Sequence, residues 1–132
     1  MSEPFFDTNV LLYLFSEEAA KASRSEALLA KGGVVSVQVL NECLTAGRRK
    51  LKKSLPEIDL LLRLVRKTCR VVPVTIDVHD HGRVLLERFH LQVYDSMIVA
   101  AALLAGCKTL WSEDMQDGFA IEGLTIRNPY KS

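Results

Sequence analysis

The sequence has few cysteines, no long apolar run and no glycine-rich loop of the kind that binds nucleotide phosphates. Its three cysteines, Cys43, Cys69 and Cys107, are odd in number, far apart and flanked by apolar residues. This spacing argues against a disulfide framework and against a C-x-x-C metal site, so we expect buried thiols in a reducing compartment. Motifs of the G-x-x-x-x-G-K-[ST] and G-x-G-x-x-G types are absent, which argues against the nucleotide-binding folds that use them.

Signals for a membrane or for export are also missing from the sequence. No segment approaches the run of about 18 apolar residues that a membrane span needs, and MSEPFF lacks the basic and apolar regions of a secretion signal. We therefore expect a soluble, cytoplasmic protein without a membrane partner. With 132 residues and 48% hydrophobic content, the chain can bury a core unaided, and we expect one domain over residues 1–132.

Short β-branched or aromatic runs alternate with longer helical patterns along the chain. Strands that are separated by helices of about a dozen residues need crossover connections, which produce a parallel sheet. The pattern therefore predicts an α/β fold. The predicted strands are Pro4–Phe6, Val34–Val37, Val71–Val74, Thr109–Trp111 and Thr125–Arg127, and the predicted helices are Val10–Phe15, Glu17–Lys31, Val37–Leu51, Ile58–Thr68, Ile76–Phe89 and Met97–Ala105.

Four acidic residues, Asp7, Glu42, Asp95 and Asp114, lie at the edges of apolar segments. Such an acid is drawn toward the core by its neighbours but resists losing its water, so it needs a compensating cation or donor. In an open parallel sheet, ligands bind beyond the carboxyl ends of the strands, and all four acids fall where they could meet there. Oxygen ligands suit a hard divalent ion, so the pattern predicts a shared Mg²⁺ or Mn²⁺ site.

Each acid also has a simpler interpretation. Asp7 and Asp95 could cap helices, and Glu42 could lie on the solvated flank of an amphipathic helix. Asp114 and Asp117 lie near Gly118 and could form a turn, a role that suits Asp117 better. Taken one at a time, these residues do not decide between the two interpretations.

Basic residues gather in the middle of the chain. Nine of the seventeen lysines and arginines lie between Arg48 and Arg70. A basic surface beside an acidic metal cleft fits a polyanionic substrate, although a solvated helical face has the same composition. The candidates for substrate binding are Arg48, Arg49, Lys50 and Lys52.

Four motifs carry a resemblance to a known family. They are D-T-N-V-L at Asp7, S-x-x-x-x-N-E ending at Glu42, Y-D-S-M-I-V-A-A-A around Asp95 and L-W-S-E-D-M-Q-D-G around Asp114. Their order and spacing over essentially the whole chain resemble the PIN-domain ribonucleases and, more narrowly, the VapC toxins of type II toxin–antitoxin modules. The resemblance implies a PIN-like, three-layer α/β/α fold with a central parallel sheet of four to five strands. It makes the four acids the catalytic, metal-binding quartet, with Asp117 as an additional metal ligand.

The resemblance also implies an activity and partners. The activity is cleavage of RNA by an Mg²⁺- or Mn²⁺-dependent endoribonuclease, through in-line attack of an activated water. Thr8 and Ser112, and less directly Asn9 and Ser96, would orient the carboxylates, although ordinary capping explains these four residues equally well. The implied partners are a second copy of the chain and a cognate VapB-like antitoxin that covers the acidic cleft. The alternative function is a PIN-like scaffold that binds RNA or protein without cutting it.

Overall fold

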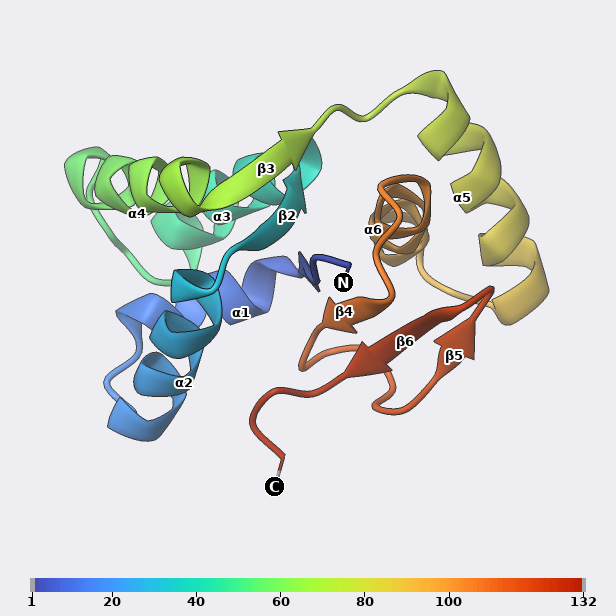
Figure 1. Ribbon diagram of the computed structural model, residues 1–132. Helices are drawn as coiled ribbons and strands as arrows, with labels where there is room; N and C mark the ends of the chain where they lie inside the picture. Colours follow the sequence, from blue (N-terminus) through green and yellow to red (C-terminus); the bar gives the residue numbers. More distant parts are fainter. Residues whose placement is uncertain (1, 132) are drawn as a thin grey trace.

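The computed structural model describes residues 2–131 of the chain, and Figure 1 shows how its elements are arranged. The strands are β1 (Phe5–Phe6), β2 (Gly33–Ser36), β3 (Cys69–Val72), β4 (Thr109–Trp111), β5 (Ala120–Ile121) and β6 (Leu124–Arg127). The helices are α1 (Thr8–Leu12), the 3₁₀ helix η1 (Tyr13–Phe15), α2 (Ala19–Ala30), α3 (Val37–Arg49), α4 (Leu55–Thr68), α5 (Ile76–Phe89) and α6 (Val93–Leu104).

The strands form one sheet in the order β3-β2-β1-β4-β6-β5, in which every neighbouring pair is parallel except β5 with β6. The predicted parallel α/β fold is confirmed, but the sheet has six strands rather than four to five. The sequence pattern missed β5 because two residues carry no periodicity. Strand β3 begins two residues before the predicted Val71 and ends before Pro73, which has no N–H to donate to a neighbouring strand.

Helices cover both faces of the sheet, which confirms the three layers. Figure 1 shows α5 and α6 together on one side and α1 to α4 on the other. Phe5 and Phe6 of β1 point to opposite faces and are both 0% exposed, as the central strand of a sheet covered on both sides requires. Helix α6 is the buried helix that its apolar sequence predicts. It approaches α5 so closely that a Cβ atom at Gly82 would lie 2.6 Å from the sulfur of Met97.

The helices begin largely where the sequence predicts. Ser36 caps α3 by accepting a hydrogen bond from the Val39 N–H, and Ser54 and Glu57 form the predicted capping box at the start of α4. Helix α6 begins four residues before the predicted Met97. The three cysteines are buried and free, as expected. Within residues 2–131, no helix is long and apolar enough to cross a membrane.

Strand β1 occupies the position in the sheet that matters for a binding site. It lies between β2 and β4. The strands that follow it in sequence, β2 and β3, are added on one side of β1, and β4 is then added on the other side. Crevices form outside the carboxyl ends of the strands at such a point. Asp7, Val37 and Ser112 are the first residues after β1, β2 and β4, so this edge of the sheet brings distant parts of the sequence together.

Candidate active site

Asp7 follows β1 and is held in place by its backbone and by three donors. Its N–H donates to the Trp111 carbonyl at 3.0 Å, which ties it to the end of β4. Its carboxylate accepts hydrogen bonds from the Thr8 N–H at 2.7 Å, from Ser112 Oγ at 2.8 Å and from Asn9 Nδ2 at 3.1 Å. Asp7 therefore caps α1, as the simpler interpretation held, and also presents its second oxygen to Ser112 and Asn9.

The protonation of Asp7 reflects its burial. The side chain is only 4% exposed, and this loss of water raises its pKa from 3.8 to about 6, against the lowering effect of the Ser112 and Thr8 hydrogen bonds. The negative charges of Asp95 and Glu42 raise this pKa further. The fold thus holds a buried carboxylate beside two other acids, which is costly unless a cation is near.

Glu42 comes from α3 and is half-buried. Thr8 Oγ1 donates to its carboxylate at 2.6 Å, so the Thr8 hydroxyl contacts Glu42. Gln38, one helical turn earlier, donates through Nε2 to the other oxygen of Glu42 at 2.8 Å and to the Tyr94 carbonyl at 3.1 Å. Both oxygens of Glu42 are therefore tied to neighbours, and the Gln38 contact links α3 to the start of α6.

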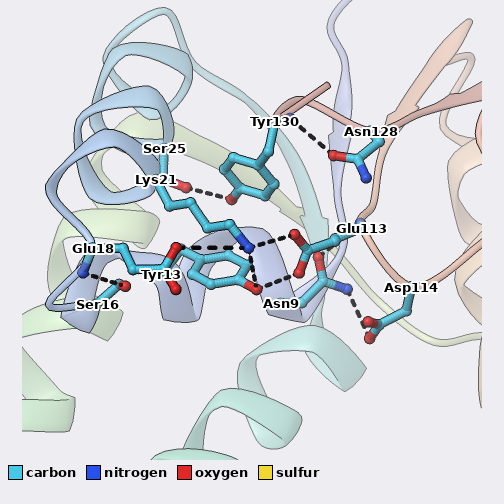
Figure 2. Close-up of polar contacts among 10 residues, drawn as sticks. All are labelled: Asn9, Tyr13, Ser16, Glu18, Lys21, Ser25, Glu113, Asp114, Asn128 and Tyr130. Atoms are coloured by element: carbon cyan, nitrogen blue, oxygen red, sulfur yellow. Dashed lines mark hydrogen bonds and ion pairs between the residues drawn. The ribbon is translucent and has the colours of Figure 1, made fainter. Parts of the chain in front are cut away.

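Asp114 lies in the loop after β4 and is exposed. Asn9 Nδ2 donates to its carboxylate at 3.1 Å, as Figure 2 shows, and the same nitrogen donates to Asp7. The amide oxygen of Asn9 accepts from the Glu113 N–H at 3.0 Å. Asn9 therefore joins the first of the four acids to the last of them, a more central position than its sequence context indicates.

Asp95 is in the first turn of α6, but it does not cap the helix. Gln92 is the N-cap residue, so the capping interpretation of Asp95 is wrong. Within residues 2–131, no group donates a hydrogen bond to the Asp95 carboxylate, which leaves both of its oxygens available to a ligand. Burial raises the pKa of Asp95, and the charges of Asp114 and Glu42 raise it further.

All four acids line a single cleft of about 440 Å³ at the edge of the sheet described above. Three of its walls come from the end of β1, from α3 and from the start of α6, and the loop after β4 supplies the fourth. The structure thus brings together acids that are up to 107 residues apart in the sequence. The remaining cleft residues are Thr8, Asn9, Leu12, Thr45, Ala46, Arg49 and Lys50.

Comparison with known proteins identifies the family. Residues 5–120 match the sequence model of the PIN domain. The chain belongs to the PIN domain family. No curated protein matches it by sequence.

Solved structures with the same fold include chains of toxin–antitoxin systems. A chain of a toxin–antitoxin complex from Klebsiella pneumoniae superimposes with a TM-score of 0.71 at 23% identity, covering 98% of this chain and 99% of the other. VapC20 of Mycobacterium tuberculosis, a toxin that cleaves the sarcin-ricin loop, superimposes with a TM-score of 0.68 at 20% identity over 84% of this chain and 91% of its own. VapBC2 of Rickettsia felis, solved with a fragment of its promoter DNA, superimposes with a TM-score of 0.69 at 17% identity. The match covers 95% of this chain and 97% of the other.

The acids of this PIN domain suit a hydrated divalent ion better than a bare one. Their donors are all carboxylate oxygens, the type that Mg²⁺ and Mn²⁺ prefer. Among residues 2–131, no three side chains of the Asp, Glu, His or Cys type are close enough to hold a metal by themselves. Mg²⁺ commonly keeps several waters and takes only one or two carboxylates directly, so a cleft wide enough for water fits it.

The basic candidates lie beside the acids of the PIN domain. Arg49 and Lys50 line the acidic cleft itself. Arg48, Arg49 and Lys52 line a neighbouring hollow of about 540 Å³, which shares Arg49 and Thr45 with the cleft. All four side chains are exposed, so the acidic cleft continues into a basic trough along α3.

Asp117 and Ser96, two further candidates from the sequence, neither line the cleft nor donate a hydrogen bond to any of its acids within residues 2–131. Asp117 accepts a hydrogen bond from the Asn128 N–H at 2.7 Å and holds the turn before β5, which is the alternative role that its context favours. Ser96 is 0% exposed and donates to the Val93 carbonyl within α6. Ser96 therefore contacts its own helix rather than an acid.

Sequence reasoning did not single out Gln38 or Glu113. The four-residue spacing of Gln38 and Glu42 on one helix was a usable signal, because side chains at i and i+4 are neighbours. Glu113 gave no such signal, because its partners Tyr13 and Lys21 are about 100 residues away in the chain. Only the tertiary structure brings those groups together.

Proposed function

We propose that this PIN domain is an Mg²⁺- or Mn²⁺-dependent endoribonuclease and the toxin of a type II toxin–antitoxin pair. The observation that carries the proposal is the convergence of Asp7, Glu42, Asp95 and Asp114 on one cleft at the sheet edge. A module that only bound RNA would gain nothing from collecting mutually repelling carboxylates. The similarity in fold to chains of toxin–antitoxin complexes supports the toxin assignment.

In this proposal Asp7, Asp95 and Asp114 surround the divalent ion, one or two of them binding it directly and the rest through its water molecules, and Glu42 completes the acidic wall. When bound, such an ion lowers the pKa of a coordinated water and offsets the negative charge that develops on a scissile phosphate. Ser112 and Thr8 fix the carboxylates of Asp7 and Glu42 through hydrogen bonds of 2.8 and 2.6 Å. We leave Asp117 out of the ligand set because it does not line the acidic cleft.

The substrate in this proposal is an RNA strand that lies along α3. Arg49 and Lys50 at the cleft, followed by Arg48 and Lys52 in the adjoining hollow, provide a path of positive charge for successive phosphates. These exposed side chains attract any phosphodiester backbone and carry no base-specific information.

Replacing Arg49 by Gln is expected to weaken RNA binding without changing the chemistry. KM should rise several-fold and the slope of log KM against log salt should fall by about 1, because one phosphate contact is lost. Steady-state cleavage at three salt concentrations measures both. Arg63→Gln is the matched control, because Arg63 is exposed on α4 and lines neither the cleft nor the basic hollow. An equal effect of both variants would show that only overall charge matters.

The partners proposed are a cognate VapB-like antitoxin, which covers the acidic cleft, and a second copy of the chain. An arginine of the antitoxin would replace the missing cation and pair with two carboxylates. An apolar groove of about 240 Å³ adjoins the cleft and is suited to anchor such a segment, since it includes Leu12, Phe15, Ala46 and Leu51. We also propose that the chain is a single domain and acts in the cytoplasm.

The decisive test is cleavage of RNA by the purified chain. The parent is incubated with total cellular RNA and Mn²⁺, and the new 5′ ends are mapped by sequencing. Defined ends that disappear in EDTA support the nuclease. RNA that is bound but stays intact with Mn²⁺ would overturn it and favour the scaffold that binds RNA without cutting.

A further inference from the structure

Asp114 is the most exposed of the four acids in the cleft and belongs to a loop rather than to a helix or strand. Among residues 2–131, Asn9 Nδ2 is the group that donates to its carboxylate. Metal affinity depends on the spacing of the ligand atoms. A ligand on a loop keeps that spacing only if the loop itself is held in place. The contacts of the neighbouring residue, Glu113, therefore bear on the site.

The Glu113 side chain turns away from the cleft and meets two groups of the helical layer. Tyr13 of η1 donates its hydroxyl to one carboxylate oxygen of Glu113, and Lys21 Nζ of α2 donates to the other at 2.9 Å. Lys21 Nζ also donates to the Tyr13 hydroxyl at 3.2 Å, which closes a triangle of contacts that Figure 2 shows. We call Tyr13, Lys21 and Glu113 the Glu113 clamp.

The surroundings of Lys21 hold this triangle in place. Its ammonium group lies 4.6 Å from the ring centroid of Tyr13 and 5.4 Å from that of Tyr130. The two rings meet edge to face at 4.8 Å, and the Tyr130 hydroxyl pairs with Ser25 Oγ of α2 at 2.7 Å. The Lys21 and Glu113 side chains are 28% and 25% exposed, so water screens their ion pair less than it screens a fully exposed pair.

The backbone N–H of Glu113 connects the clamp to the acids through Asn9. Its N–H donates to Asn9 Oδ1 at 3.0 Å. An asparagine amide has one acceptor end and one donor end, so this bond decides that Nδ2 faces the carboxylates. Asn9 Nδ2 then donates to Asp7 and Asp114 at 3.1 Å each. A displaced Glu113 would free the Asn9 amide to turn and would loosen both acids.

We propose that the Glu113 clamp positions Asp114 and the Asn9 amide for binding of a divalent ion in the acidic cleft. The proposal rests on the metal-dependent nuclease function proposed above. None of the three clamp side chains is a catalytic residue, since each acts through Asn9 or through the loop that carries Asp114. Tyr13 and Lys21 thereby tie the helical layer to the loop after β4, across about 100 residues of sequence.

The test uses two variants and one matched control. Glu113→Gln weakens the contact with Lys21, and Tyr13→Phe removes the hydroxyl while keeping the ring. Tyr130→Phe is the control, because it also removes one tyrosine hydroxyl from the same cluster but breaks only the contact with Ser25. Calorimetry measures Mn²⁺ affinity, hydrogen exchange measures the protection of amides 112–115, and steady-state kinetics separates kcat from KM.

We expect Mn²⁺ to bind about tenfold more weakly to Glu113→Gln and Tyr13→Phe, with faster exchange of amides 112–115. At saturating Mn²⁺, kcat and the KM for RNA should stay within about twofold of the parent, because the acids themselves are intact. Tyr130→Phe keeps the ring beside Lys21 and should stay within about twofold of the parent in every measurement. Unchanged Mn²⁺ affinity in both clamp variants, or equal losses in Tyr130→Phe, would overturn the proposal.

Failure of the nuclease function would look different. In that case the parent itself would take up no Mn²⁺ and cut no RNA. Hydrogen exchange would still show whether the clamp holds the loop, because protection of amides 112–115 requires neither metal nor substrate. Unchanged protection in Glu113→Gln and Tyr13→Phe would show that the clamp does not hold the loop.

Discussion

Replacing Asp7 by Asn should abolish RNA cleavage and at the same time stabilise the metal-free protein. The loss of activity is expected to exceed about 100-fold, because even a partner of a metal ligand is worth roughly 10- to 100-fold. The gain in stability follows from the burial of Asp7, which is 4% exposed and lies beside Asp95 and Glu42. The neutral amide is nearly isosteric, can still accept from the Thr8 N–H and can donate its new NH₂ group to Ser112 Oγ. It loses the contact with Asn9 Nδ2, but we expect the removal of a buried charge to outweigh that loss.

Two measurements on the same protein separate these effects. Cleavage is followed with Mn²⁺, and urea unfolding is followed in EDTA at pH 7.5. Mn²⁺ should raise the unfolding free energy of the parent but not that of Asp7→Asn, because a ligand stabilises only the state that binds it. Asp59→Asn, on the exposed face of α4, is the matched control and should change neither quantity. A destabilised and still active Asp7→Asn variant would contradict the proposed role of the residue.

The contribution of Asp7 to the stability of the metal-free protein should fall as the pH rises from about 4 to about 7. The pKa of Asp7 is about 6 in the folded protein, whereas the ordinary value of 3.8 applies to the unfolded chain. Between these two pH values the folded state therefore binds more protons than the unfolded state. The slope of unfolding free energy with pH is therefore negative in this window, and the stabilising contribution present below pH 3.8 is lost by about pH 7. The shift corresponds to about 3 kcal/mol. Asp95, whose pKa is also raised, contributes with the same sign.

The contribution of Asp7 is isolated by comparing two proteins. Urea unfolding of the parent and of Asp7→Asn is measured in EDTA at several pH values, and the difference in unfolding free energy is plotted. Groups such as Glu57, whose pKa is lowered in the fold, titrate in both proteins and cancel. The difference should change by about 3 kcal/mol across the window, in favour of Asp7→Asn at high pH. A difference independent of pH would mean that Asp7 ionises as an ordinary carboxylate.

These two predictions have one physical origin. The fold accepts an unfavourable carboxylate at the end of its central strand, and the proposed divalent ion removes the penalty when it binds. Stability and activity therefore conflict at Asp7, as at many functional sites. At Asp7, the carboxylate that the proposed activity requires lowers the stability of the metal-free fold.

The sequence determined much of this protein by itself. Alternating β-branched and helical segments indicated the parallel α/β fold, because periodicity is a local property of the chain. Four acids next to apolar segments indicated the cleft, and the serine of S-L-P-E indicated the start of α4. The boundaries that failed, such as the start of β3, depend on where a neighbouring element ends rather than on local pattern.

Only the tertiary structure decided how the acids are held. It placed Asn9 between Asp7 and Asp114, left the carboxylate of Asp95 without a donor, engaged Asp117 in a turn, and joined Glu113 to Tyr13 and Lys21. A hydrogen bond depends on distance and direction between two groups, and the sequence separation of those groups carries no such information. Contacts across about 100 residues arise because parallel strands end at a common edge, and that edge exists only once the sheet has formed.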